Sequence, residues 1–370
     1  EARTGTLPHE DGEPALELFY VGVVTDLDRR ALDAASIPYR HVPSGKIRRY
    51  LSGAHWTVLD LLVRLPWGIL RALKELFVLM PDVVFSKGGY GSVPTVLAAW
   101  LYRIPVLLHE SDLAPGLANL RLARFAASIA VGFRAAERLF PQRKVFVSGI
   151  PLREAFRRLP DPAEARTRLG LHDRLPVLFV TGGSQGAQRL NTALLAILPR
   201  LVARAQIVHQ VGDNNFPAIE EFITKDLRHL PGVEGYRAVG TLAEEDMAAA
   251  FAAADLVVSR AGGTVLAEIA ADGKPSILVP LHEAAQQHQW ENAYFFREQG
   301  SAVVLDETNM SSAIFEATIL RLLENPQDLR LMAERVSALA RPGAADDLAE
   351  VLSAMAQGRV PKRLVAEAAP

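Results

Sequence analysis

The chain has 370 residues, of which 49% are hydrophobic and 22% charged, a composition typical of a globular protein with room for two domains. Its formal net charge of -2 gives no reason to expect nucleic acid as a partner. Cys is absent, which excludes disulfides and thiolate metal sites. No uninterrupted apolar run reaches about 18 residues, so the sequence argues against a membrane-spanning helix.

Short, continuously apolar runs alternate with helical patterns along the chain. Such runs are typical of parallel strands that helices cover on both faces. They predict an α/β protein made of two doubly wound, Rossmann-like parallel-sheet domains with a cleft between them. The predicted strands are 17–21, 82–85, 106–108, 128–131, 144–147, 177–180, 206–210, 256–258, 277–279 and 302–305.

Two prolines, Pro151 and Pro162, bracket a charged stretch near the middle of the chain and predict the joint between the domains. The expected organisation is a first domain over 1–150 and a second over 151–345. Residues 346–370 are expected to form a C-terminal helix and tail.

Residues 46–77, KIRRYLSGAHWTVLDLLVRLPWGILRALKELF, combine basic and large apolar side chains. Basic residues around exposed Trp and Leu predict contact with an anionic membrane surface. The alternative is that the apolar residues form the core face of a helix and the charges its solvated face. Pro66 and Gly68 favour two pieces over one long helix. The basic residues are Lys46, Arg48, Arg49, Arg64, Arg71 and Lys74, and the apolar ones are Trp56, Leu61, Leu62, Leu65, Trp67, Ile69 and Leu70.

Glycine-rich turns follow three of the predicted strands, at 86–92, 182–187 and 259–263. A glycine turn at a helix N-terminus directs unpaired N–H groups and the positive helix end at an anion, typically a phosphate. None of the three has Walker A or GxGxxG spacing, which argues against ATP- and NAD-binding sites, and no cofactor is expected. Each turn alone is more typical of strand-to-helix packing. Packing, however, does not need the Ser, Lys or Arg that accompanies these glycines.

The turn at 259–263 begins the most informative segment of the chain. Thr264 is expected to cap a short helix that carries Glu268, whose carboxylate is placed to accept the hydroxyls of a ribose. A polar set follows the next strand, at the edge where open α/β sheets bind ligands. These features predict a site for a nucleotide diphosphate that carries a sugar. Alone, Glu268 is more typical of a favourable negative charge in a first helical turn. The polar set is Gln286, Gln287, His288, Gln289 and Asn292.

Five segments together resemble the MurG family of peptidoglycan transferases: SKGGYGSVP, PVLLHESDLAPGLAN, SGIPLR, VTGGSQGAQRLN and SRAGGTVLAEIAADGKPSILVP. That family transfers GlcNAc from UDP-GlcNAc to undecaprenyl-pyrophosphoryl-MurNAc-peptide (lipid I), which yields lipid II. The resemblance implies a GT-B fold, a UDP-GlcNAc donor, a lipid I acceptor and a peripheral location on the cytoplasmic face of the bacterial cell membrane. No Asp-x-Asp pair follows a strand at the expected place, so no metal is expected.

The resemblance also implies where the nucleotide binds. Glu268 matches the glutamate that holds the ribose, and Arg153 matches an arginine at the nucleotide. Ser184, Gln185 and the glycines around them match the cradle of the diphosphate. The uracil contact is a backbone one near Leu242. The turn of Arg260, Gly262, Gly263 and Thr264 completes this part of the expected site.

Three further residues are implied at the donor sugar. His288 and Gln289 match the polar pair that reads the sugar hydroxyls, and Asp112 stands where other members carry Asn. Arg153 and Arg260 are, taken alone, as typical of solvated arginines as of ligand contacts.

One expected feature of the family does not occur in the sequence. The family opens with a strand and a GGTGGHxxP turn whose histidine is the proposed general base, and this chain has no such turn. We therefore assign no catalytic residue, and expect the chain to be truncated at its N-terminus. Two alternatives stay open. The first is another GT-B enzyme that uses UDP-sugars, such as a glycolipid glycosyltransferase or a UDP-GlcNAc 2-epimerase, and the second is a protein that binds the donor but is inactive.

Overall fold

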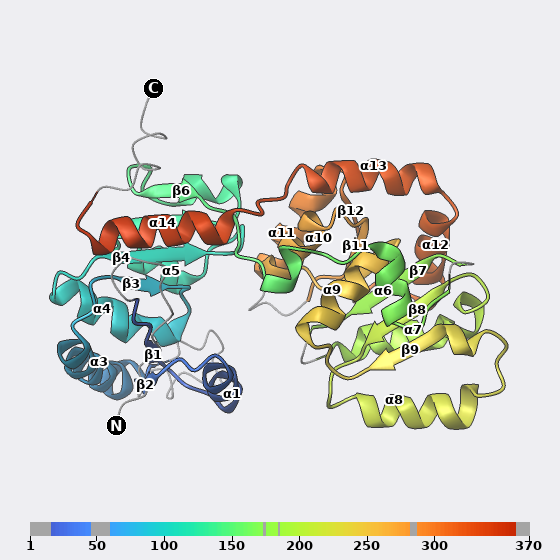
Figure 1. Ribbon diagram of the computed structural model, residues 1–370, viewed down its shortest axis with the longest axis horizontal. Helices are drawn as coiled ribbons and strands as arrows, with labels where there is room; N and C mark the ends of the chain where they lie inside the picture. Colours follow the sequence, from blue (N-terminus) through green and yellow to red (C-terminus); the bar gives the residue numbers. More distant parts are fainter. Residues whose placement is uncertain (1–15, 46–59, 173–174, 184–185, 282–286, 360–370) are drawn as a thin grey trace. The chain divides into compact units, whose positions relative to one another are not determined.

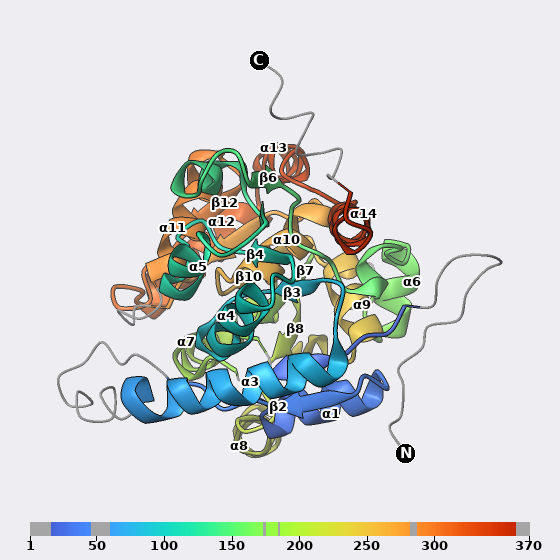
Figure 2. The ribbon, with the colours of Figure 1, turned by 90° about the vertical axis from the view of Figure 1, so that its left-hand side faces the viewer.

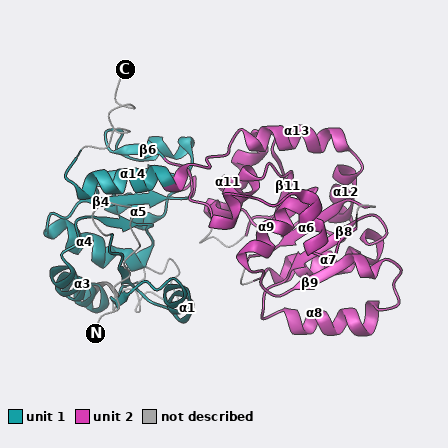
Figure 3. Ribbon diagram, viewed as in Figure 1, with its two compact units in different colours: residues 1–111, 115–147, 346–370 teal, residues 112–114, 148–345 magenta. Residues whose placement is uncertain are grey.

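The structure, a computed structural model, describes residues 16–45, 60–172, 175–183, 186–281 and 287–359 (Figure 1). The chain divides into two compact units (Figure 3). Unit 1 comprises Glu1–Ser111, Pro115–Val147 and Asp346–Pro370, and unit 2 comprises Asp112–Ala114 and Ser148–Ala345. The chain therefore enters unit 2 briefly at residues 112–114 before it returns to unit 1.

Unit 1 contains a parallel four-stranded sheet in the order β3-β4-β5-β6. The strands are Val84–Ser86, Val106–Glu110, Ser128–Val131 and Val145–Val147. The last described helix, α14 (Ala344–Ala356), packs its Leu348, Val351 and Met355 against side chains of this sheet. The other described α-helices of unit 1 are α1 (Asp26–Ala34), α3 (Leu65–Leu79), α4 (Val93–Leu101) and α5 (Leu117–Leu122), and a π-helical turn, Asp60–Arg64, precedes α3.

A second, two-stranded parallel sheet of unit 1 consists of β1 (Tyr20–Gly22) and β2 (Tyr39–His41). It differs from the prediction in two respects. The first strand lies at Tyr20–Gly22 instead of 17–21, and β2 was not predicted because its residues are polar or half-buried. Helix α4 contacts both β1 and β3, and the Thr95 hydroxyl donates to the Val21 carbonyl at 3.3 Å. The described part of unit 1 thus contains two sheets where one was expected.

Unit 2 is built on a parallel six-stranded sheet in the order β12-β11-β10-β7-β8-β9. Strand β9 (Tyr236–Val239) was not predicted, because it is the edge strand and only one of its four residues is buried. The other strands are β7 (Val177–Thr181), β8 (Gln206–Gln210), β10 (Leu256–Ser259), β11 (Ser276–Leu278) and β12 (Ala302–Val304). The helices are α6 (Pro162–Arg168), α7 (Gln188–Leu201), α8 (Phe216–Phe222), α9 (Glu244–Ala253), α10 (Gly263–Ala271), α11 (Gln287–Glu298), α12 (Ser312–Leu323) and α13 (Pro326–Ser337).

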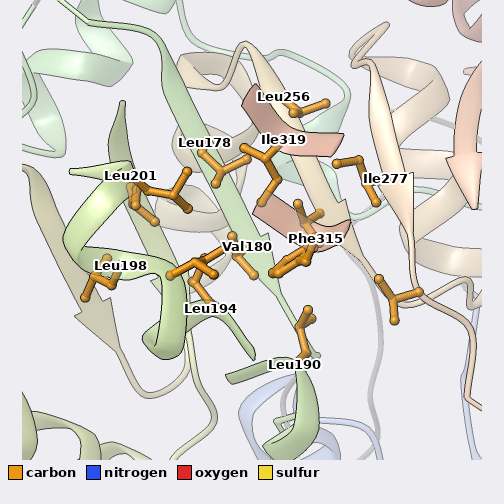
Figure 4. Close-up of a cluster of buried hydrophobic side chains, with 14 of the residues drawn as sticks. Leu178, Val180, Leu190, Leu194, Leu198, Leu201, Leu256, Ile277, Phe315 and Ile319 are labelled. Atoms are coloured by element: carbon orange, nitrogen blue, oxygen red, sulfur yellow. The ribbon is translucent and has the colours of Figure 1, made fainter. Parts of the chain in front are cut away.

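In the core of unit 2, side chains of α7 and α12 pack against one face of this sheet (Figure 4). Leu190, Leu194 and Leu198 recur at helical spacing, and all three are fully buried. Phe315 and Ile319 of α12 complete the cluster over Leu178 and Val180 of the sheet. The other face includes an edge-to-face contact of Phe179 with Phe251 on α9, at 5.3 Å between ring centroids.

The C-terminus of α10 carries a buried carboxylate that should make stability depend on pH. Burial raises the pKa of Asp272 to about 6, although Lys274 lies 3.6 Å away and opposes the shift. Because the pKa is higher in the folded protein, the contribution of Asp272 to stability is greatest below its unfolded-state pKa, near 4. This contribution is lost as the pH rises through about 6. Asp272→Asn should therefore raise the free energy of unfolding at pH 7.5 by about 2 kcal/mol. Urea denaturation at pH 4 and pH 7.5 checks this, and an equal effect at both values would contradict it.

Candidate functional site

The sheet of unit 2 has a topological switch point between β7 and β10. The chain runs outward from β7 through β8 to β9, and β10 then pairs on the other side of β7 and leads outward to β11 and β12. Open α/β sheets bind ligands at the carboxyl ends of the strands that flank such a point. Two of the predicted glycine turns follow these two strands. The fold therefore brings both turns to one edge of the sheet.

The turn after β10 presents uncapped helix N–H groups. Gly262 is the N-cap of α10, with φ -74° and ψ 148°, and no side chain caps the helix. The expected Thr264 cap is wrong, because the helix begins at Gly263 and Thr264 already lies in its first turn. A Cβ added at Gly262 would meet no atom within 4 Å, so packing within the protein does not explain this glycine. The turn leaves open space in front of the positive end of α10.

The turn after β7 has a similar character. Gly183 has φ +82°, and a Cβ there would also face open space. Its N–H donates to the Thr181 hydroxyl at 3.1 Å, which holds the start of the turn against the strand. Gly182 has a packing reason instead, since a Cβ would lie 2.5 Å from that of Ala187. Ser184 and Gln185, both predicted to bind the diphosphate, lie outside the described residues.

Glu268 on α10 is buried with an arginine partner. It is 2% exposed, and its Oε1 accepts from Nε and Nη2 of Arg153 at 2.8 and 2.7 Å. Burial raises the pKa of Glu268, the cation of Arg153 opposes this shift, and the charge of Glu244 adds to it. Both arginine contacts involve the same carboxylate oxygen, Oε1. The structure thus joins two residues that are 115 positions apart and that the sequence assigned separately to the nucleotide.

Arg260 has a different environment from the one expected of a solvated arginine. It is 8% exposed, its Nη1 donates to the Val279 carbonyl at 2.9 Å, and its Nη2 pairs with Glu307. The side chain therefore ties the β10 turn to the loop after β12. Within the candidate site, Arg260 therefore has contacts that suit a residue that shapes the turn.

Helix α11 brings the predicted sugar-reading residues together with Asp112. His288 Nε2 lies 4.0 Å from Asp112 Oδ2, and both side chains are partly exposed. Gln289 is 8% exposed, and its Oε1 accepts from the Leu281 N–H at 3.1 Å. Asp112 and this helix both belong to unit 2. Leu242 is half-buried in the loop between β9 and α9, at the same edge of the sheet.

Asn292, which the sequence placed in the polar set, makes contacts that the sequence did not predict. It is fully buried and bonds Asp112, the Leu113 N–H and the Ala261 carbonyl. The signal was present, because Asn292 lies four residues after His288 and so on the same face of a helix. Its partners were hidden, since no periodicity predicts a contact with residue 112. The arrangement as a whole offers N–H groups for a diphosphate, a carboxylate for a ribose and polar groups for a sugar.

Comparisons with known proteins identify the family of the chain. Residues 12–131 match the glycosyltransferase family 28 N-terminal domain, and residues 177–348 match the C-terminal domain of that family. A curated relative from Bacillus anthracis, UDP-N-acetylglucosamine–N-acetylmuramyl-(pentapeptide) pyrophosphoryl-undecaprenol N-acetylglucosamine transferase 2, is 36% identical over 300 residues, 80% of each chain. A transferase of the same name, without the final number, from Legionella pneumophila (strain Paris) is 32% identical over 93% of this chain and 90% of its own.

Two solved structures place the fold. The crystal structure of Acinetobacter baumannii MurG matches with a TM-score of 0.68 and 26% identity, over 90% of each chain. A UDP-GlcNAc 2-epimerase from Neisseria meningitidis matches with a TM-score of 0.58 and 14% identity, over 91% of this chain and 99% of that one, which shows a shared fold alone. The chain has the GT-B fold and belongs to glycosyltransferase family 28, within it to the MurG family of pyrophosphoryl-undecaprenol N-acetylglucosamine transferases.

Proposed function

We propose that this protein transfers GlcNAc from UDP-GlcNAc to the C4 hydroxyl of MurNAc in lipid I, a step of peptidoglycan synthesis. The observation that supports it most is the pair of open glycine turns at the switch point of unit 2, next to buried Glu268. Relatives at 32–36% identity carry this activity in their names. The epimerase alternative has only a shared fold in its favour.

Each part of the donor has a group of suitable chemistry in unit 2. The carboxylate of Glu268 would accept hydrogen bonds from the ribose hydroxyls. Arg153 would hold Oε1, which leaves the other oxygen to face the ribose. The helix end at Gly262 and the open turn at Gly183 would hold the diphosphate and stabilise the negative charge of the departing UDP. Asp112, His288 and Gln289 would read the hydroxyls of GlcNAc. In the reaction, the MurNAc C4 hydroxyl attacks the anomeric carbon and loses its proton as the bond to UDP breaks.

A transfer assay tests the proposal. The protein is incubated with UDP-GlcNAc labelled in the sugar and with lipid I in detergent micelles, and label is measured in the extracted lipid. We expect acceptor-dependent transfer of label to the lipid. Conversion of UDP-GlcNAc to UDP-ManNAc without acceptor would instead favour an epimerase, and binding of UDP-GlcNAc without either product would favour a binding protein.

Gln289 provides a test of how the sugar is read. We expect Gln289→Ala to reduce the preference for UDP-GlcNAc over UDP-GalNAc by about fivefold, the loss of one neutral hydrogen bond, with little change in affinity for UDP. Isothermal calorimetry with the three ligands measures this. Gln299→Ala, which removes an exposed glutamine directly after the same helix, is the matched control. Equal losses for all three ligands would contradict the role of Gln289.

The protein would act at the cytoplasmic face of the membrane, and α3 supplies the surface for this. Trp67, Leu70 and Phe77 recur at helical spacing and are 62%, 61% and 67% exposed, whereas Ala72 and Leu76 form the buried face. The apolar residues named from the sequence are thus not all a core face. The described basic residues Arg64, Arg71 and Lys74 of this region are exposed, while Lys46, Arg48, Arg49 and Trp56 lie outside the described residues.

Helix α4 packs against α3 (Figure 2). Trp100 and Leu101 at its end, and Tyr102 directly after it, are 49%, 54% and 43% exposed. We call these three residues, together with Trp67, Leu70 and Phe77, the apolar patch. An apolar patch beside basic side chains suits the surface of an anionic bilayer, where the lipid-linked acceptor resides. No helix in the described ranges is long and apolar enough to cross a membrane.

A further inference from the structure

Arg153, the partner of Glu268, lies on a short turn of unit 2. Residues Glu154–Phe156 form one turn of 3-10 helix, η5, and Arg153 is its N-cap residue. The Phe156 N–H donates to the Arg153 carbonyl at 3.0 Å, which closes the turn. A single helical turn is not stable by itself, so the position of Arg153 depends on the elements that pack against η5.

Helix α9 makes two kinds of contact with this turn. Phe251, fully buried on α9, packs edge-to-face against Phe156, with 5.2 Å between the ring centroids. Glu244, the first residue of α9, accepts a hydrogen bond from the Ala155 N–H at 2.9 Å through Oε1. A bond from a backbone N–H to a carboxylate is charge-assisted and stronger than a bond to a neutral acceptor. The contact of Glu244 therefore fixes the backbone of η5 directly.

An acidic residue at this place also suits a helix N-terminus. The first turn of α9 contains Glu244, Glu245 and Asp246, and negative charges there are favourable in any helix. The structure nevertheless separates Glu244 from its neighbour. Glu245 is exposed, whereas Glu244 is half-buried with its carboxylate on the backbone of η5. A general preference for acidic residues does not account for that contact.

The charge of Glu244 also reaches Glu268. Burial raises the pKa of Glu268, the cation of Arg153 lowers it, and the charge of Glu244 raises it further. Glu244 therefore acts on Glu268 in two ways. It holds the turn that carries Arg153, and it opposes the ionisation of the Glu268 carboxyl. The first effect favours a binding-competent carboxylate and the second disfavours it, so an experiment can separate them.

We infer that Glu244 is a positioning residue for the nucleotide, whose carboxylate binds the backbone of η5 to α9 and thereby keeps Arg153 on Oε1 of Glu268. This inference rests on the proposed function, because it takes Glu268 as the ligand of the ribose. Without the bond to Ala155, η5 leaves its place in part of the unliganded molecules. The nucleotide must then restore that place on binding, which lowers its apparent affinity.

Calorimetry with UDP at pH 7.5 tests this role. We expect Glu244→Ala to weaken UDP binding by about fivefold, as if η5 held Arg153 in place in about a fifth of the unliganded molecules. Glu244→Gln keeps a side-chain carbonyl for the Ala155 N–H and should recover most of the lost affinity. In an Arg153→Ala background, Glu244→Ala should cause little further loss, because its effect runs through Arg153. Glu245→Ala removes an acidic residue from the same helical turn and is the matched control, with unchanged UDP binding expected.

The pH dependence of UDP binding supplies a readout that a purely structural role would not change. Among the described residues, the charged groups that act on Glu268 are Arg153 at η5 and Glu244 on α9. The ribose contact needs the ionised carboxylate, so UDP affinity should fall as the pH falls through the pKa of Glu268. Glu244→Gln removes a charge that raises this pKa, and the fall should therefore occur at a lower pH than in the unaltered protein.

Several results would overturn the positioning role. These are unchanged UDP affinity in a folded Glu244→Ala variant, an equal loss from Glu245→Ala, and an undiminished loss in the Arg153→Ala background. An unshifted pH profile in Glu244→Gln would overturn it as well, and this measurement remains decisive if Glu244→Ala does not fold. If Glu268→Ala loses UDP affinity and Glu244→Ala does not, this inference alone fails. If the unaltered protein does not bind UDP, the proposed function fails together with it.

Discussion

Glu268→Ala is expected to weaken UDP binding by roughly 1.5–3 kcal/mol, a rise in Kd of about 10- to 150-fold. The side chain is 2% exposed at the switch-point edge, where its carboxylate would form charge-assisted hydrogen bonds with both ribose hydroxyls. The variant should lose little folding stability, because the Arg153 side chain is 35% exposed and water can hydrate it once Glu268 is replaced. Calorimetry with UDP measures the change in affinity.

Two controls separate a ribose contact from a structural effect. Burial raises the pKa of Glu268, so ionisation costs folding stability, and that cost appears as the pH rises through the folded pKa. Glu268→Gln should therefore leave the unfolding midpoint at neutral pH unchanged or higher, while UDP affinity still falls. For the unaltered protein, UDP affinity should decline on acidification at a higher pH than an ordinary glutamate would give. A folded Glu268→Ala variant with unchanged affinity for UDP would refute the assignment.

Replacement of Trp67, Leu70 and Phe77 by Ser is expected to reduce binding to anionic vesicles by about 100-fold. All three side chains are more than half exposed, and insertion of each at the bilayer surface contributes about 1 kcal/mol. Stability should change little, because the buried face of α3 is formed by other residues. Co-sedimentation with vesicles that contain phosphatidylglycerol measures the binding.

A matched variant tests whether exposed apolar area in general is responsible. Phe222, Ile314 and Leu331 of unit 2 are 37%, 50% and 42% exposed and lie outside the apolar patch. Their joint replacement by Ser should leave vesicle binding unchanged. Equal losses from both triple variants, or none from the α3 variant, would contradict a membrane role for α3.

The sequence predicted those strands whose residues are apolar on both faces. Leu256, Val257 and Val258 of β10 are fully buried, so a continuous apolar run was a sufficient signal. The same signal is missing in β2, which reads Tyr-Arg-His, and in β9, where Arg237 is exposed. Such strands are defined by their backbone pairing with a neighbour, and single-sequence patterns do not contain that information.

The sequence predicted most residues of the candidate site but not the contacts between them. A glycine turn after an apolar strand was enough to predict Gly262 and Glu268, because both residues lie within one short strand–turn–helix segment. The Arg153 contact with Glu268 and the Asn292 contact with Asp112 join residues 115 and 180 positions apart, which no spacing rule reveals. Arg260 illustrates the same limit, since its burial depends on Glu307 in a distant loop.

A crystal structure with UDP-GlcNAc bound would test the position of the donor site most directly. We predict the diphosphate at the turns 182–187 and 259–263, a ribose hydroxyl within hydrogen-bond distance of Glu268, and the GlcNAc ring facing Asp112 and α11. Such a structure would also show whether Ser184 and Gln185 contact the phosphates as predicted. Nucleotide bound away from the carboxyl edge of β7 and β10, or a ribose that does not contact Glu268, would contradict this position of the donor site.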